Sequence, residues 1–512
     1  MNLPRPSLAA YLLNAFLAAG AYFLAGSYWV EQGAPSADEG FYLYASSAVW
    51  HGAVPYRDFG YTQTPLLPYV QGAVFSAVGY GVRGQRWLNV AWVAAAAGLS
   101  AILLTAAGAP LPWRVLLLLC WCLCKPLVYW SSVGKTYGFC ELLMIGAALC
   151  LQGSFLLPDR GAKGRRLALL AVLSMLCVLA VGCRLTAAPS AGLLWLGYAL
   201  VDRGRTPPTL LVGIPVLFAL LCIGPFYALD PRNAAFWTWT YHHLNQAHFS
   251  RTGLLMDSAR AAMAPAALGL AGAALVIARL ARPGAGDPAP VRHGPLWRPG
   301  TWVLAAGLAG WVIPVALSGV YSEYAIPSVP LVIVGFGLLV SRPGAPAGRP
   351  GAPALAAYAA TAIALGVGFA GGGDLVLPGY LDAVDQTATV VRRETRPDDP
   401  VLTSMPEIAV ASGRPVFPRL ELGKFGLTGE MDPVLARARH VLPFQELLDA
   451  VNAEACPVVV LFTKDLKWNF TWSIPSFRVI PPASTAQLQQ ALATHYRQID
   501  ANEFFAVYRR RS

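Results

Sequence analysis

The chain has 512 residues, of which 56% are hydrophobic and only 13% charged, and its mean hydropathy is +0.50. These values exclude an ordinary soluble protein and are typical of a polytopic membrane protein. The formal net charge of +11 does not indicate nucleic-acid binding, because many Arg and Lys residues lie in short loops between apolar runs, as membrane orientation requires.

The apolar runs predict membrane-spanning helices, because lipid offers no hydrogen-bond partners to a backbone in any other conformation. Arg5 precedes the first run without a cleavage signal, which indicates an uncleaved anchor.

Residues 65–80 are ambiguous. If they crossed, the basic loops at 159–166, 203–205, 282–298 and 342–349 would all lie outside, so we expect an interfacial helix there.

We therefore expect an α-helical polytopic membrane protein with about eleven spans, a cytoplasmic N-terminus and juxtamembrane helices in its first external loop. The expected spans are 8–30, 87–107, 115–130, 137–157, 167–183, 186–201, 209–228, 259–281, 301–318, 324–340 and 352–370. The external loops are then 31–86, 131–136, a polar turn at Arg184, 229–258 and 319–323.

A change in composition after residue 373 predicts two domains, a membrane domain over 1–373 and a soluble one over 374–512. The second part is charged, with a strand candidate at 458–462 and a helical stretch at 486–496. We expect a small extracytoplasmic α/β domain, large enough for its own core. It contains no catalytic constellation.

The nine cysteines do not predict a disulfide framework, since eight lie in or at the ends of apolar runs, where Cys is a small hydrophobe. The Cys120-x-Cys122-x-Cys124 run has no nearby His or acidic ligands, so no metal site is predicted there.

Charged and aromatic residues collect on the external side of this topology, and each also has a structural interpretation. Asp38 and Glu39 fit a helix cap in a solvated loop. Lys125 fits a side chain that reaches the interface, and Arg184 a solvated turn residue. His242, His243 and His248 lack metal-ligand spacing, and the aromatic residues around them fit an interfacial belt.

Taken together, these residues suggest a chemistry. A carboxylate at the membrane surface can act as general base on an acceptor hydroxyl, and cations at the same depth can stabilise a leaving phosphate. A groove between helices can hold a polyprenyl tail. These features describe sugar transfer from a lipid phosphate.

The sequence resembles the C-superfamily (GT-C) membrane glycosyltransferases of the protein O-mannosyltransferase and aminoarabinose-transferase type. The resemblance rests on Asp38-Glu39 after the first helix, Val-Pro-Tyr-Arg-Asp-Phe at 54–59 and Thr-Pro-Leu-Leu-Pro-Tyr at 64–69. The segment Tyr-Ala-Ile-Pro-Ser-Val-Pro at 324–330 is similar to a late helix entry of the family. The likeness covers about 370 residues in architecture, but only the first loop is specific.

The resemblance implies that Asp38 is the catalytic carboxylate and that Arg184 binds the donor phosphate. Glu39, next to Asp38, is the second catalytic candidate. Lys125, Lys135 and Arg57 are further phosphate-binding candidates. Where relatives often have an acidic residue and Lys, this chain has Gln63 and Thr64, which puts a metal or lysine contact there in doubt. The candidates for substrate binding are Asp58, Tyr61, Gln63, Glu141, His243, Arg251, Glu323 and Tyr324.

The expected function is an inverting transferase at the outer face of a bacterial inner membrane, using a polyprenyl-phosphate sugar and a lipid, glycan or protein hydroxyl as acceptor. No cofactor is certain, and a divalent metal stays open. Membrane lipids are expected partners and nucleic acid is not. The alternatives are a transporter or flippase of a lipid-linked saccharide, or a non-catalytic assembly partner.

Overall fold

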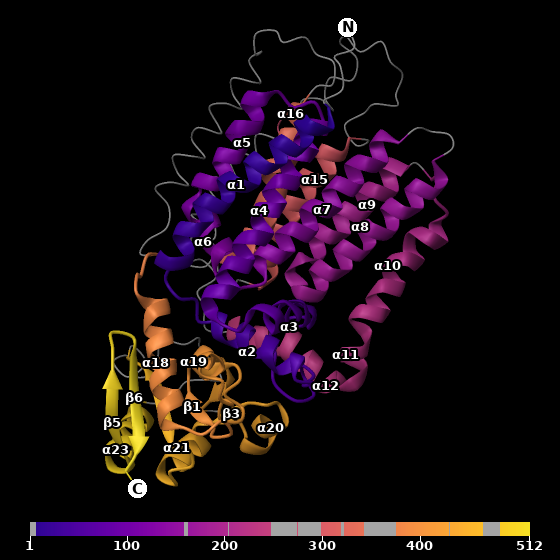
Figure 1. Ribbon diagram of the computed structural model, residues 1–512. Helices are drawn as coiled ribbons and strands as arrows, with labels where there is room; N and C mark the ends of the chain where they lie inside the picture. Colours follow the sequence, from indigo (N-terminus) through magenta and orange to yellow (C-terminus); the bar gives the residue numbers. More distant parts are fainter. Residues whose placement is uncertain are drawn as a thin grey trace, which may run out of the picture.

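The structure of the protein is a computed structural model that describes residues 7–157, 162–202, 204–246, 274, 298–318, 322–341, 375–429, 431–463 and 482–511. It consists of a helical bundle followed by a smaller α/β unit (Figure 1). The chain begins at one end of the bundle, and the α/β unit lies beyond the opposite end.

Within the described ranges, five helical segments are long and apolar enough to cross a membrane. They are α1 (Leu8–Gln32), α4 (Val82–Ala106), α7 (Tyr137–Leu156), α8 (Lys163–Cys183) and Glu323–Val340, which joins η4 (Ser322–Ser328) to α16 (Val329–Val340). The remaining helices of the bundle are η1 (Leu185–Ala187), α9 (Ala188–Asp202), α10 (Pro208–Cys222), α11 (Gly224–Leu229), α12 (Pro231–Ala235), η2 (Phe236–Thr240), α13 (Tyr241–Gln246) and α15 (Pro299–Ser318).

The span predicted at 115–130 is not one straight helix. It is a pair, α5 (Leu111–Leu123) and α6 (Lys125–Ser132), bent by 65°. Pro126 explains the break, because it has no N–H to donate to the carbonyl four residues earlier. Apart from residue 274, the spans predicted at 259–281 and 352–370 lie outside the described residues, so the count of eleven stays a prediction.

The first loop contains two short helices, α2 (Glu39–Trp50) and α3 (Leu66–Val78), which lie between the bundle and the α/β unit (Figure 1). With 13 residues, α3 is about 20 Å long, short of the ~30 Å hydrocarbon core. Arg83 at the start of α4 bonds Glu31 at the end of α1, at 3.0 Å. Both helix ends therefore lie on one side, as the interfacial prediction for residues 65–80 requires.

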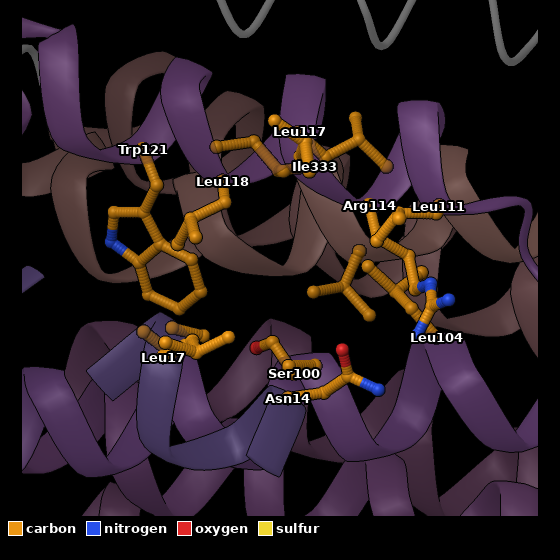
Figure 2. A pocket seen from close by; sticks show the side chains of 15 residues that line it. Asn14, Leu17, Ser100, Leu104, Leu111, Arg114, Leu117, Leu118, Trp121 and Ile333 are labelled. Carbon is orange, nitrogen blue, oxygen red and sulfur yellow. The ribbon is translucent and has the colours of Figure 1, made fainter. Parts of the chain in front are cut away.

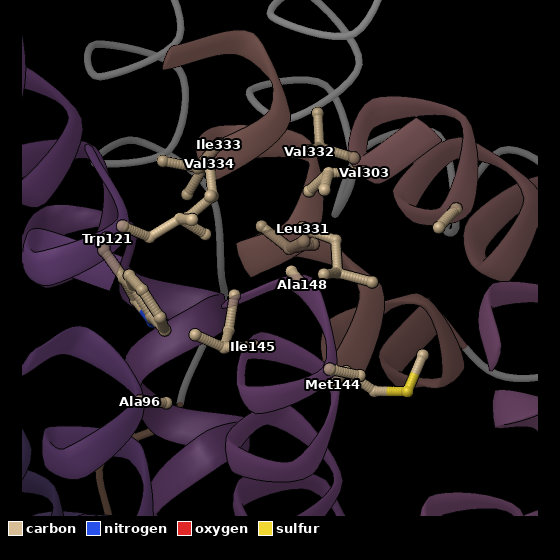
Figure 3. Packing of buried hydrophobic residues seen from close by; sticks show 14 of the residues in the cluster. Ala96, Trp121, Met144, Ile145, Ala148, Val303, Leu331, Val332, Ile333 and Val334 are labelled. Carbon is tan, nitrogen blue, oxygen red and sulfur yellow. The ribbon is translucent and has the colours of Figure 1, made fainter. Parts of the chain in front are cut away.

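The bundle packs around aliphatic side chains of α4, α7, α15 and α16, including Ile145, Val303 and Leu331 (Figure 3). Glycines allow α15 and α16 to approach closely. A Cβ on Gly335 would collide with the backbone of Leu304, and one on Gly307 would meet the backbone nitrogen of Val332. Small residues at such crossings are a general means of packing helices in membranes.

The α/β unit contains a four-stranded sheet in the order β1 (Val401–Thr403), β4 (Val458–Phe462), β6 (Phe505–Arg510), β5 (Tyr496–Ala501). The β1–β4 pair is parallel and the other two pairs are antiparallel. Strand β4 coincides with the predicted strand. The other elements are α18 (Tyr380–Glu394), α19 (Pro406–Ser412), η5 (Gly423–Gly426), β2 (Leu427–Thr428), α20 (Pro433–Ala438), β3 (Leu442–Pro443), α21 (Phe444–Asn452) and α23 (Pro482–His495).

The α/β unit packs directly on the first loop. Helix α19 packs on α2, and the ring of Phe425 meets that of Phe41 at 5.9 Å. Two backbone hydrogen bonds join the end of α1 to the chain that enters the unit, Ala34 N–H to the Leu375 carbonyl and Leu377 N–H to the Gln32 carbonyl. The domain boundary predicted at residue 373 lies outside the described residues and stays a prediction.

Candidate active site

Asp38 stands at the entry to α2 and is the accessible carboxylate of this region. It occupies the N-cap position, but its side chain makes no capping bond. Instead its Oδ2 lies 2.9 Å from the Lys135 Nζ, while the Asp38 side chain remains 27% exposed. One carboxylate oxygen is thus held by a cation, and the group stays open to a substrate.

Lys135 is almost fully enclosed, in the short loop between α6 and α7. Its side chain is 3% exposed and lies 3.5 Å from Glu323 Oε1 as well as beside Asp38. Its ammonium also sits 4.5 Å from the ring centre of Trp130. Burial lowers the pKa of Lys135, but the Asp38 and Glu323 carboxylates outweigh it, and the pKa is raised well above its usual value. Lys135 is therefore a fixed positive charge.

Glu39 has a different environment from its neighbour. Arg86 of α4 donates hydrogen bonds to both carboxylate oxygens of Glu39, at 2.7 and 2.8 Å. The backbone N–H groups of Ser36 and Gly134 donate to the same carboxylate. The same guanidinium donates to the carbonyls of Val30, Gly33 and Ala34. Glu39 and Arg86 are both buried. The pair joins α1, α2, α4 and the Lys135 loop behind Asp38.

Arg184 follows the last residue of α8, where the backbone turns into η1. Its Nε donates to Thr186 Oγ1 at 2.8 Å and one terminal nitrogen donates to Thr136 Oγ1 at 3.1 Å. The guanidinium lies between two rings, 4.6 Å from the centre of Tyr137 and 4.4 Å from that of Tyr324. Its other terminal nitrogen, NH2, is buried and has no hydrogen-bond partner within the described part of the chain.

Asp38 and Arg184 share neighbours. Tyr42 of α2 and Tyr324 of η4 each lie within electrostatic range of both groups. His242 of α13 does as well, and its Nε2 lies 2.7 Å from the Thr62 carbonyl oxygen. Burial lowers the pKa of His242, so this ring is neutral at pH 7. The result is a compact site of one partly exposed carboxylate and two cations, walled by tyrosines.

Of the predicted substrate-binding residues, Glu323 and Tyr324 join this cluster. Tyr61 packs its buried ring against Tyr42, which places it behind the site, and its hydroxyl has no partner in the described ranges. The remaining candidates have other neighbours. Arg57 and Asp58 pair with one another at the surface, Lys125 lies over Trp29, Glu141 accepts from Ser131, Gln63 accepts through its carbonyl from Tyr56, and His243 packs on Trp239. Arg251 lies outside the described residues.

Sequence reasoning did not single out Arg86, Tyr42, Tyr137 or Thr136. Tyr137 and Thr136 directly follow Lys135, so the loop itself was a usable signal. Arg86 carried no such signal, since it begins an apolar helix and resembles an interfacial cation. Among the residues that the structure describes, no group of three His, Cys, Asp or Glu side chains could hold a metal ion.

The sequence matches no protein-family model and no curated protein. The fold does match solved structures. The crystal structure of ArnT from Cupriavidus metallidurans bound to undecaprenyl phosphate has a TM-score of 0.61 at 13% identity, and covers 98% of both chains. Its apo structure has a TM-score of 0.60 at 14% identity, again over 98% of both chains.

The cryo-EM structure of arabinofuranosyltransferase AftD from Mycobacteria is a further match, at 14% identity. It covers 99% of this chain and 40% of that one, with a TM-score of 0.48.

At these identities the likeness to ArnT shows the fold alone. The chain has the fold of the GT-C membrane glycosyltransferases, as the sequence resemblance predicts. The particular arrangement is that of ArnT over nearly the whole length of both chains, the α/β unit included.

Proposed function

We propose that the protein is an inverting glycosyltransferase that takes a sugar from a polyprenyl-phosphate donor and passes it to a hydroxyl of a lipid, glycan or protein. The reaction takes place at the outer face of a bacterial inner membrane, with the N-terminus in the cytoplasm and the α/β unit in the periplasm. The observation that carries the proposal is Arg184, a buried cation whose NH2 group has no partner among the described residues, close to a partly exposed carboxylate.

Arg184 is suited to hold the donor phosphate. A guanidinium is charged at every accessible pH, and its planar donors match phosphate oxygens. A buried N–H group without a partner is costly, so an anion that accepts from NH2 is favoured there. That ArnT has been solved with undecaprenyl phosphate bound, on the same fold, supports this ligand class.

Asp38 is suited to accept the proton of the attacking hydroxyl. The acceptor oxygen forms a bond to the anomeric carbon as the bond from that carbon to the phosphate oxygen breaks. The hydroxyl proton passes to Asp38, and the polyprenyl phosphate leaves with the electron pair. Arg184 stabilises the charge that develops on the leaving phosphate, and Lys135 adds a second positive charge at the same site.

The other residues support these two. Glu39 and Arg86 fix the start of α2, so Glu39 is a positioning residue in this proposal rather than a second base. Tyr137 and Tyr324 hold the guanidinium from its two sides. Thr136 and Thr186 accept from it and so fix its orientation.

Donor turnover in membrane vesicles tests the proposal. Asp38→Asn keeps the shape of the side chain and removes the base, so release of polyprenyl phosphate should fall by at least 100-fold, roughly the value of a general base. Asp58→Asn is the matched control, an exposed acid of the same loop, and should leave turnover unchanged. Wild-type turnover in Asp38→Asn, at equal membrane insertion, contradicts the assignment.

A further inference from the structure

Asn14 and Arg114 are polar residues that line a cavity of about 110 Å³ among α1, α4, α5 and α16 (Figure 2). This cavity lies far along the bundle from the candidate active site. Its volume is far more than the ~15 Å³ that a single water molecule needs. The walls are largely aliphatic. The cavity lies towards the end of the bundle where α1 begins, because Asn14 of α1 and the first turns of α5 line it.

The cavity has a polar end and an apolar end. Figure 2 shows the Arg114 guanidinium beside the Asn14 amide at one end, and Trp121, Leu118 and Leu17 at the other. Arg114 donates through NH1 to the hydroxyl of Thr105 on the neighbouring helix at 2.8 Å. Its Nε is buried and finds no hydrogen-bond partner among the residues that the structure describes.

Arg114 is half-buried, and none of the ion pairs found in the described part of the chain includes it. A long basic side chain can reach the membrane surface instead, but such a side chain keeps its nitrogens in water. Here Nε faces the interior and NH1 is bound to Thr105. A buried N–H group without a partner is costly. Basic pockets between helices are typical sites for anionic lipid head groups.

We propose that this cavity binds an anionic glycerophospholipid from the leaflet on the N-terminal side of the bundle. The lipid phosphate accepts from Arg114, and one acyl chain lies along Leu17, Leu118 and Trp121. The site is separate from that of Arg184, and it takes a structural lipid rather than the sugar donor. The arrangement of a cation at the mouth and an aliphatic floor favours a phospholipid over a free phosphate.

The test is lipid retention by the detergent-solubilised full chain, offered equal amounts of phosphatidylglycerol and phosphatidylcholine and measured by native mass spectrometry. The wild type should prefer phosphatidylglycerol. Arg114→Gln should lower that preference by about fivefold, the value of one membrane-surface Arg. Arg165→Gln is the matched control, an exposed Arg near the start of α8, and should change nothing.

Two further variants separate the site from general effects. Arg114→Lys keeps the charge and should keep most of the preference. Ala101→Leu fills the cavity without changing any charge, and should lower retention of phosphatidylglycerol by a similar factor. Ala101→Leu still tests the lipid site if Arg114→Gln does not fold.

The proposal is overturned if Arg114→Gln keeps the wild-type preference, or if Arg165→Gln loses as much of it. It is also overturned if Ala101→Leu retains phosphatidylglycerol as the wild type does. Binding of inorganic phosphate that depends on Arg114, without any preference for phosphatidylglycerol, would assign a free-phosphate site instead.

Discussion

At the scale of single residues, two adjacent carboxylates have opposite surroundings. Asp38 is 27% exposed and touches one cation, whereas Glu39 is buried and accepts four hydrogen bonds. The difference comes from the helix start, where neighbouring side chains project in directions roughly 100° apart. Asp38 consequently faces the opening, and Glu39 faces α4.

The first prediction concerns Glu39. Glu39→Gln leaves the Arg86 charge buried without a counter-charge, which should destabilise the protein by about 3–5 kcal/mol. The measurement is thermal unfolding of the detergent-solubilised protein. Asp58→Asn, which breaks the exposed pair with Arg57, should cost at most about 1 kcal/mol. Equal effects of the two substitutions would show that the Glu39–Arg86 pair does not hold the loop together.

At the scale of elements, the α/β unit supports the start of α2. Gly40, two residues after Asp38, packs against the carboxylate of Glu407 so closely that a Cβ would collide with it. Glu407 in turn accepts a 2.6 Å hydrogen bond from the Tyr380 hydroxyl. The position of Asp38 therefore depends on a side chain that lies more than 360 residues further along the chain.

A second prediction follows for Gly40→Ala. The new methyl group forces α2 and Glu407 apart, so we expect a loss of about 1–3 kcal/mol in stability, with lower turnover. Adding Glu407→Ala makes room for the methyl group and should restore part of both. The check is a double-mutant cycle by thermal unfolding and vesicle turnover. Strictly additive effects would contradict a contact between the two positions.

A third prediction concerns pH. Burial, and to a lesser degree Glu39, raise the pKa of Glu407 to about 7, although the Tyr380 hydrogen bond lowers it. The folded state then binds more protons than the unfolded state between about pH 4.5 and pH 7. This contribution to stability is present at low pH and is lost as the pH rises through 7.

The wild type should accordingly melt at a higher temperature at pH 6 than at pH 8, by an amount worth about 1.4 kcal/mol, because only the interval from pH 6 to pH 7 contributes. Glu407→Gln stays neutral and should lose this dependence while gaining stability at pH 8. Unfolding scans from pH 5.5 to pH 8 measure both slopes. If the stability of the wild type and of Glu407→Gln changes equally with pH, a group other than Glu407 titrates.

At the scale of the whole molecule, the end of α1 lies beside the start of α4, and α2 and α3 lie on one side of the bundle. With the N-terminus in the cytoplasm, Asp398 of the α/β unit lies outside and Lys163 inside. Asp398→Cys should be labelled by an impermeant thiol reagent in intact cells, and Lys163→Cys only after permeabilisation. Both positions are exposed, while most native cysteines are buried. The reverse pattern would invert the proposed topology.

Much of the bundle was predictable, because apolar runs and loop charges follow directly from the solvent that surrounds them. The break at Cys124 was missed, although Pro126 marked it. Of the site, Asp38, Lys135, Arg184, Glu323 and Tyr324 were named from their charge and position. What the sequence did not predict is which partner each side chain meets, since the Glu39–Arg86 and Gly40–Glu407 contacts depend on tertiary packing.

The most direct test of the central claim is binding of undecaprenyl phosphate to the purified protein, measured by native mass spectrometry. We expect the wild type to bind it, Asp38→Asn to bind it equally, and Arg184→Gln to lose about 10-fold or more in affinity, because one charge-assisted contact to phosphate is removed. Arg57→Gln, which removes an exposed Arg of the first loop, should bind like the wild type. Unchanged binding by Arg184→Gln would contradict the assignment of this cation to the donor phosphate.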